Sequence, residues 1–192
     1  MRERIVEAIE DSKRALDTLL LEENQRFIEE VATHLSQNFQ KGGKVIIAGN
    51  GGSLCDASHF AEELTGFFSK NRRAPLPVIV LSEPGFLTCT ANDLDYDQVF
   101  SRGVEAFHQG PYDSFIGLST SGNSRNIIRA VECAKELEMT AITLLGEGGK
   151  LQGMGDYELM VPGFQTSDRV QEAHMMALHL IVECIEKTLF PL

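Results

Sequence analysis

The chain contains no tryptophan, and it is poor in basic residues and in long apolar runs. Against 28 acidic residues it has 17 lysines and arginines, which gives a formal net charge of −11 over 192 residues. Nucleic acids and anionic membranes bind basic surfaces, so this balance argues against either as a partner. No stretch approaches the roughly 18 consecutive apolar residues of a membrane-spanning helix. Any phosphate bound by this chain must be held locally, by backbone N–H groups or hydroxyls.

Cysteines are few and widely spaced. There are four, with no CxxC pair, at Cys55, Cys89, Cys133 and Cys184. A chain of this length buries a substantial core without disulfides, so we expect reduced thiols in a cytoplasmic protein. The first 16 residues carry charge throughout, where a signal peptide needs an apolar segment.

Hydrophobic residues follow a helical period in some segments and form short continuous runs in others. The first forty residues predict two helices with a break near Leu21–Glu23. Five apolar runs are typical of buried parallel strands, namely Lys44–Asn50, Pro77–Leu81, Ser114–Ser119, Thr140–Leu145 and Tyr157–Val161. Helical patterns separate most of them, at Ser53–Phe68, about Asp97–Phe107, Asn123–Leu137 and about Ser167–Leu189.

Strands that alternate with helices predict right-handed βαβ units and an α/β fold. We expect a three-layer αβα sandwich with a five-stranded parallel sheet and a long C-terminal helix. All of it should form one domain, residues 1–192, with packing or oligomerisation helices at 1–41 and the α/β core at 42–192. Ligands bind beyond the carboxyl ends of parallel strands, so function should lie at Gly49–Ser53, Ser82–Asn92 and Ser119–Ser124.

The segment Ser119–Ser124 reads STSGNS and joins a strand to a helix. Its hydroxyls belong to Ser119, Thr120, Ser121 and Ser124. A helix N-terminus offers unpaired N–H groups and a positive dipole, and hydroxyls add rotatable donors, so a phosphate monoester would be held well. A capped turn is the alternative, but one cap needs only one such residue. The excess of hydroxyls favours the anion site.

The segment Gly49–Ser53 reads GNGGS and also joins a strand to a helix. It begins like a dinucleotide fingerprint but has Leu54 where the third glycine belongs, so dinucleotide binding is poorly supported. A tight turn is one alternative. A second fits better with the serine segment: the backbone, Asn50 and Ser53 bind hydroxyls of another part of one ligand. No GxxxxGK[ST] phosphate loop is present.

Two helices carry residues suited to metal or proton-transfer chemistry. His59 and Glu63 are four residues apart, which puts imidazole and carboxylate on one helix face. A solvated surface pair is the alternative. On the last helix, His179 lies in an apolar stretch, where it must be a satisfied core residue, an interface residue or a ligand.

The spacing of Gln171 and His179 restricts how both could bind one ion. On a single straight helix they lie about 12 Å apart along the axis and about 80° apart around it. Either the helix starts after Gln171, or the two ligands come from different subunits. His174, three residues from Gln171, is a competing ligand.

These segments together resemble the bacterial phosphoheptose isomerases of the sugar-isomerase (SIS) fold. The resemblance rests on GNGGSxCDAxHFAEELTG (49–66), AND (91–93), SRxVEA (101–106), STSGNS (119–124) and DRxQExH (168–174) followed by His179. It runs in order along nearly the whole chain. Two departures could alter substrate contacts: Leu54, where some members have histidine, and SEPGFLT (82–88).

The resemblance implies a flavodoxin-like SIS fold and conversion of sedoheptulose 7-phosphate to D-glycero-D-manno-heptopyranose 7-phosphate. This is the first committed step towards ADP-heptose for the lipopolysaccharide core. It further implies a homotetramer with active sites at subunit interfaces, and one zinc ion per site held by residues matching His59, Glu63, Gln171 and His179. Substrate contacts would come from Asn50, Gly51, Ser53, Glu63, Asn92, Asp93, Ser119, Thr120, Ser121, Ser124, Asp168 and Gln171.

The chemistry of an aldose–ketose isomerisation suits two of these residues. It needs a base near C2, an acid/base near the carbonyl oxygen, and charge stabilisation at that oxygen. We expect Glu63 to be the base and His179 to move the oxygen-bound proton. A carboxylate that also binds zinc is a poorer base, so the metal is either structural, regulatory or catalytic. Two other functions stay open: a non-catalytic SIS protein that binds a replication initiator, and a SIS domain that senses a phosphosugar.

Overall fold

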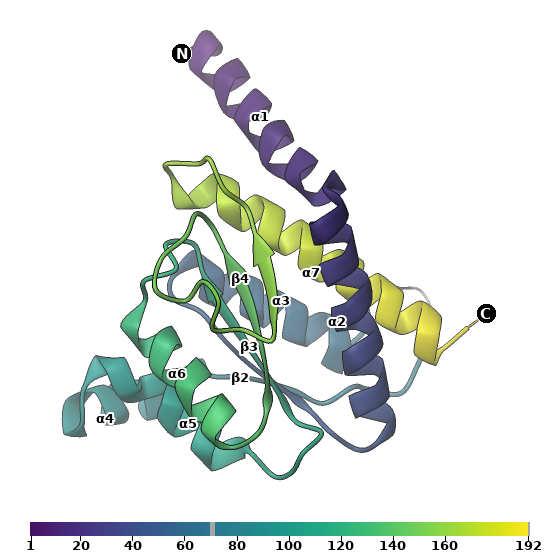
Figure 1. Ribbon diagram of the computed structural model, residues 1–192, viewed down its shortest axis with the longest axis vertical. Coiled ribbons are helices and arrows are strands. Elements are labelled where there is room, and N and C mark those ends of the chain that lie inside the picture. Colours follow the sequence, from purple (N-terminus) through teal and green to yellow (C-terminus); the bar gives the residue numbers. More distant parts are fainter. Residues whose placement is uncertain (70–71, 192) are drawn as a thin grey trace.

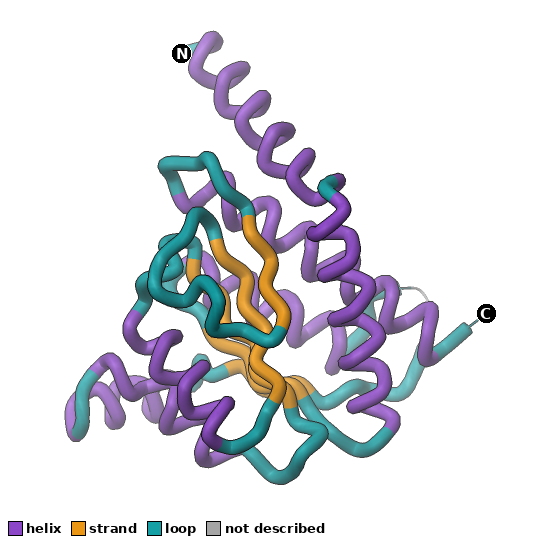
Figure 2. The backbone as a smooth tube through the Cα atoms, viewed as in Figure 1, coloured by secondary structure: helices purple, strands orange, loops and turns teal. Residues whose placement is uncertain are grey.

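The computed structural model describes residues 1–69 and 72–191, and its centre is a parallel sheet of five strands (Figures 1 and 2). The strand order is β2-β1-β3-β4-β5, and every neighbouring pair is parallel. The strands are β1 (Val45–Ala48), β2 (Val78–Val80), β3 (Ser114–Ser119), β4 (Thr140–Leu145) and β5 (Tyr157–Met160). The expected α/β fold with five parallel strands is confirmed.

Helices cover both faces of the sheet. The layer on one face contains α2 (Glu22–Gln40), α3 (Gly52–Thr65) and α7 (Ser167–Leu189), and the layer on the other contains α5 (Val99–Phe107) and α6 (Arg125–Glu136). Two further helices are α1 (Arg2–Asp17) and α4 (Pro84–Asp93). Short 3₁₀ turns lie at Thr18–Leu20 and Tyr96–Gln98. Successive strand residues point to opposite faces, so Val45 and Ile47 pack with α2, α3 and α7, whereas Ile46 and Ala48 pack with α5 and α6. The result is the three-layer sandwich expected from the alternating pattern.

The structure differs from the sequence prediction at two helix starts. Most of the expected loop Ser82–Asn92 is helix α4, because the Glu83 carboxylate accepts hydrogen bonds from the N–H groups of Gly85 and Phe86 at 2.9 and 2.6 Å. Pro84 at the first helical position strengthens this start. Helix α6 begins at Arg125 rather than Asn123, with Ser124 as its N-cap residue.

Helix α1 extends away from the rest of the molecule (Figure 1). Its apolar residues Ile5, Val6 and Ile9 are 54%, 55% and 51% exposed. Exposed apolar side chains on one helix are the usual mark of an interaction surface. Within the described residues, no helix has the length and hydropathy to cross a bilayer.

Candidate active site

The segments that follow β1 and β3 lie side by side at the carboxyl ends of these two strands. The helices that follow them cross to opposite faces of the sheet. Strands β1 and β3 are neighbours, while α3 packs on one face of the sheet and α6 on the other. Parallel α/β folds bind ligands in the crevice that this arrangement creates. Here it holds a cavity of about 290 Å³, lined by Asn50, Gly51, Gly52, Ser53, Leu118, Ser119, Thr120, Ser124, Ser167 and Gln171. Five of these residues carry hydroxyl groups.

The first of the two segments is held in shape by a side-chain amide network. Asn50 and Asn126 exchange two hydrogen bonds, each 2.9 Å long, and the hydroxyl of Tyr96 donates to Asn50 Oδ1 at 3.0 Å. Gly51 has φ +57° and ψ −121°, a conformation that only glycine adopts without strain. Sequence reasoning did not identify Asn126 or Tyr96. The sequence signal for Asn126 was an amide side chain in the first turn of a helix, on a face that is otherwise apolar.

Gly52 allows a close approach between α3 and α7. A Cβ atom at this position would lie 2.6 Å from the side-chain amide atoms of Gln171. The Gln171 amide therefore lies directly against the backbone at the start of α3, and it closes one side of the cavity.

The serine segment presents hydroxyls to the cavity rather than using all of them as caps. Ser124 is the N-cap residue of α6, yet its side chain makes no capping hydrogen bond. Instead the Ser119 hydroxyl donates to Ser124 Oγ at 3.0 Å. Ser121 behaves differently, since its Oγ accepts from the N–H of Asn123 at 3.2 Å, and Ser121 does not line this cavity. Ser119, Thr120 and Ser124 are thus the hydroxyls that this segment presents to an anion in the cavity.

A second cluster lies farther along the same two helices. The carboxylate of Glu63 on α3 contacts two imidazoles. His59 Nε2 and His179 Nε2 each lie 3.2 Å from Glu63 Oε1. The centroids of the His59 and His179 rings are 5.0 Å apart, and the two ring planes make an angle of 80°. The structure therefore brings His179 of α7 to the pair that helical spacing predicts on α3.

Glu63 is the buried member of this cluster. Its side chain is 8% exposed, whereas those of His59 and His179 are 47% and 33% exposed. Burial raises the pKa of Glu63 above its ordinary value, although the neighbouring His179 and His59 act in the opposite direction. The second carboxylate oxygen, Oε2, is buried and has no hydrogen-bond partner among the described residues. Such an atom is costly unless a ligand or a proton occupies it.

The cluster has the geometry of a metal site. One ligand atom from each of His59, Glu63 and His179 can be chosen so that all three lie within 4.8 Å of one another. Tetrahedral zinc ligands 2.0–2.1 Å from the ion lie about 3.3 Å apart, and imidazole and carboxylate are donors that zinc takes. The two distances of 3.2 Å agree with this spacing. The three residues fit a divalent metal ion.

Gln171 lies apart from this cluster within one chain. Helix α7 runs continuously over Ser167–Leu189 and so contains both Gln171 and His179. The alternative in which the helix starts after Gln171, which would let both residues bind one ion, is wrong. The two residues are about 12 Å apart along the axis. His174 does not compete as a ligand, because it is completely buried and its Nε2 lies 3.0 Å from the carbonyl oxygen of Leu145. Burial lowers the pKa of His174 to about 4.

Three other expected contact residues lie on exposed surfaces of the chain. Asn92 and Asp93 are at the C-terminal end of α4, where Asn92 Nδ2 donates to Asp93 Oδ1 at 2.8 Å. Asp168, at the start of α7, pairs with Arg169 at 2.9 Å. None of the three lines the cavity described above. Arg169 also pairs with Glu172, so its charge is already neutralised by carboxylates.

Comparison with known proteins agrees with this arrangement. The SIS domain family model matches residues 9–146. A phosphoheptose isomerase from Fusobacterium nucleatum is 56% identical over 171 residues, which are 88% of this chain and 87% of that protein. Solved phosphoheptose isomerases from Neisseria gonorrhoeae and Francisella tularensis are similar with TM-scores of 0.85 and 0.88, at 36% and 34% identity. These similarities cover 97% and 96% of this chain, and 98% and 97% of those structures.

The doubly wound sheet, the hydroxyl-lined cavity at its switch point and the family match define the class of protein: the chain belongs to the SIS domain family. Within that family it is grouped with the phosphoheptose isomerases, so it is an isomerase enzyme.

Proposed function

We propose that the chain converts sedoheptulose 7-phosphate to D-glycero-D-manno-heptopyranose 7-phosphate in the cytoplasm. The observation that carries this proposal is the pairing of a buried carboxylate, Glu63, with an imidazole, His179, at 3.2 Å. The product is then the precursor of ADP-heptose for the lipopolysaccharide core, as the resemblance implies. Four free thiols support a reducing compartment.

The reaction transfers one proton between two carbons and one between two oxygens. Glu63 removes a proton from C1 of the ketose, which gives an enediolate, and returns it to C2. His179 delivers a proton to O2 and accepts the proton of O1, so no atom is gained or lost. A buried carboxylate with a raised pKa is a stronger base than an exposed one, which suits this step.

Zinc is the metal that we assign to His59, Glu63 and His179. When bound, zinc can polarise a carbonyl oxygen and stabilise the charge that develops there. Gln171 is the fourth ligand in this proposal. Within one chain it lies about 12 Å away along α7, so it has to come from a second subunit.

The substrate is held by the cavity at the switch point. The phosphate binds to Ser119, Thr120 and Ser124 at the start of α6, with Ser121 beside them, because the helix N-terminus and the hydroxyls supply donors without a basic residue. Asn50, Gly51 and Ser53 bind sugar hydroxyls from the opposite side of this cavity. Asn92, Asp93 and Asp168 are the remaining contacts that we assign to the sugar.

A complete site requires more than one chain. Ser53 and Glu63 are separated by about 15 Å along α3, and Gln171 and His179 by about 12 Å along α7. The anion cavity and the acid–base pair of one chain therefore lie at different places, and two subunits must combine them. We propose a homotetramer with shared sites, assembled in part through the helices of residues 1–41, of which α1 exposes apolar side chains.

Turnover decides between this function and the two alternatives. The purified protein is incubated with sedoheptulose 7-phosphate in the presence of Zn²⁺, and the aldose product is followed by NMR. A phosphosugar sensor would bind the substrate without converting it, and a protein that binds a replication initiator would not need Glu63, Gln171 and His179 together. Formation of the aldose supports the isomerase; unchanged ketose contradicts it.

A further inference from the structure

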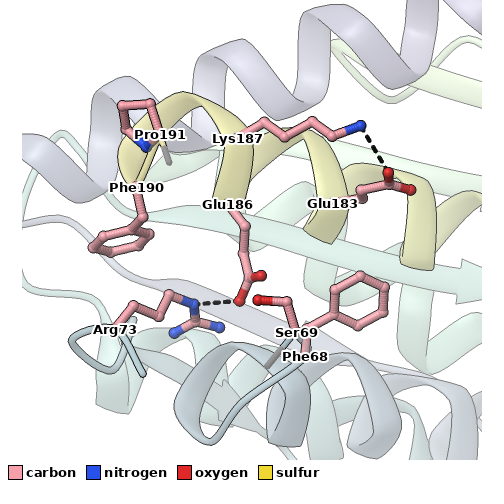
Figure 3. A pocket seen from close by; sticks show the side chains of 8 residues that line it. All are labelled: Phe68, Ser69, Arg73, Glu183, Glu186, Lys187, Phe190 and Pro191. Carbon is pink, nitrogen blue, oxygen red and sulfur yellow. Dashed lines mark hydrogen bonds and ion pairs between the residues drawn. The ribbon is translucent and has the colours of Figure 1, made fainter. Parts of the chain in front are cut away.

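A buried arginine lies at the end of α3 that is remote from the cavity. Arg73 is in the segment between α3 and β2, and its side chain is only 2% exposed. Figure 3 shows it facing α7 beside Phe190 and Glu186, in a pocket of about 470 Å³. Nothing in the proposed reaction uses this residue.

Each nitrogen of the Arg73 guanidinium has a partner. Nη2 donates to the carbonyl oxygen of Glu63 at 2.7 Å, and Nη1 donates to the carbonyl oxygens of Leu64 and Ala74 at 2.9 and 3.0 Å. The carbonyls in the last turn of a helix have no partner within that helix. Arg73 therefore caps the end of α3 at the backbone of Glu63 itself.

The remaining nitrogen connects this cap to the other helix of the site. Arg73 Nε donates to Glu186 Oε1 at 2.5 Å, and this ion pair is drawn in Figure 3. Glu186 follows His179 on α7 by seven residues, about two helical turns, so both lie on nearly the same face. The guanidinium thus contacts the backbone of Glu63 and a residue on the His179 face of α7.

We propose that Arg73, acting through Glu186, is a positioning residue that fixes α3 against α7 so that Glu63 and His179 keep their separation of 3.2 Å. The inference rests on the roles proposed for that pair. It does not require Arg73 to touch the substrate.

The chemistry of arginine suits this task. Its planar fork donates several hydrogen bonds in fixed directions, whereas the ammonium of lysine is a point charge on a flexible stem. The Phe190 ring lies 5.6 Å from the guanidinium carbon and limits its movement. A misplacement of about 1 Å at reacting groups can reduce a rate about 100-fold.

The test uses Arg73→Lys, which keeps the positive charge beside Glu186 but removes the planar guanidinium and its set of hydrogen-bond donors. Lys187→Met is the matched control, because Lys187 pairs with Glu183 at 2.7 Å on the same helix but is 73% exposed. Two experiments are made on protein that circular dichroism shows to be folded: steady-state kinetics give kcat and KM for sedoheptulose 7-phosphate, and titration calorimetry gives the affinity for Zn²⁺ alone.

We expect Arg73→Lys to lower kcat by about tenfold or more with KM within about twofold, since the cavity is remote from Arg73. Its Zn²⁺ affinity should fall by about tenfold at unchanged stoichiometry, a change that a loss of stability alone would not cause. Lys187→Met should match the wild type in both. Wild-type kcat and Zn²⁺ affinity in Arg73→Lys would overturn the inference.

A second variant covers the case in which Arg73→Lys does not fold. Glu186→Gln keeps an acceptor for Nε but removes the charge, and the same two measurements then decide: a smaller loss supports the inference and wild-type values overturn it. If the wild type has no turnover, the proposed function is wrong, and the Zn²⁺ titration alone decides the role of Arg73. If the wild type converts the substrate without binding Zn²⁺, the kcat of the variant decides the role of Arg73.

Discussion

The imidazole Nε2 of His179 lies 3.2 Å from Oε1 of Glu63, across the contact between α7 and α3. His59 shares the same oxygen, and the other carboxylate oxygen is buried without a partner among the described residues. One chain therefore brings together the carboxylate and imidazole proposed for proton transfer and three side chains that could hold a metal ion. The hydroxyl-lined cavity of the same chain lies elsewhere. It is more than two helical turns from Glu63 along α3 and from His179 along α7.

Replacement of the proposed base tests the catalytic role of Glu63. Glu63→Gln should lower kcat by about 10²–10⁴, the range for loss of a general base. Glu62→Gln is the control, since Glu62 immediately precedes Glu63 on the helix and its side chain is 66% exposed, and we expect wild-type turnover from it. Steady-state kinetics measure both. Similar turnover of Glu63→Gln and wild type would show that another group removes the proton.

The metal cluster is tested through its exposed ligand. His59→Gln should weaken Zn²⁺ binding in titration calorimetry by at least tenfold, because the amide is a poorer ligand than imidazole. Glu132→Gln serves as the control, since Glu132 pairs with Arg129 at 3.1 Å on α6, and it should bind Zn²⁺ as the wild type does. Equal Zn²⁺ affinities of His59→Gln and wild type would mean that the ion binds elsewhere.

The serine segment is tested by removing hydroxyls. Ser119→Ala and Ser124→Ala should each raise KM by about ten- to hundredfold, with smaller changes in kcat, because a hydrogen bond to a charged group contributes a net free energy of about 1.5–3 kcal/mol. Ser58→Ala is the control, since its hydroxyl donates to the Leu54 carbonyl of its own helix. Unchanged KM would reduce the segment to a helix cap.

The close approach at Gly52 gives a steric prediction. In Gly52→Ala the new Cβ would lie 2.6 Å from the Gln171 amide, so this side chain must move away from the cavity. We expect kcat/KM to fall by about tenfold or more. Gly110→Ala is the control, because none of the atoms that the structure describes lies within 4 Å of its added Cβ. Wild-type kinetics in Gly52→Ala would show that the position of Gln171 is unimportant.

His174 predicts how stability depends on pH. Its pKa is lowered to about 4 in the folded state, against an ordinary value of 6.5, so between these values the unfolded chain binds more protons. The free energy of unfolding is therefore highest above pH 6.5, and it falls by up to about 3 kcal/mol as the pH drops to about 4.

The variant His174→Gln should lose this part of the pH dependence, since glutamine can still donate to the Leu145 carbonyl but does not titrate. Urea unfolding at pH 7 and pH 4.5 measures it. The difference between the two pH values should be smaller in the variant than in the wild type. An equal difference in both proteins would assign the effect to other groups.

Local patterns in the sequence were sufficient to predict the sheet, its five strands and the long last helix. Apolar runs such as Ser114–Ser119 can be buried only between two helical layers, and the helical spacing of His59 and Glu63 places them on one face. The start of α4 was missed because the capping role of Glu83 competes with the turn tendency of the following proline and glycine.

Only the tertiary structure decided which distant residues meet. The family resemblance implied that Glu63 and His179 share a site, but no spacing along the chain encodes their pairing. It depends, like the pairings of Asn50 with Asn126 and of Arg73 with Glu186, on how α3, α6 and α7 pack on the sheet. Periodicity is a local property of the backbone, so the sequence by itself determined the elements and the chemistry of their side chains. Distances between helices are set by the packing of side chains from the whole core, and they became known only with the fold.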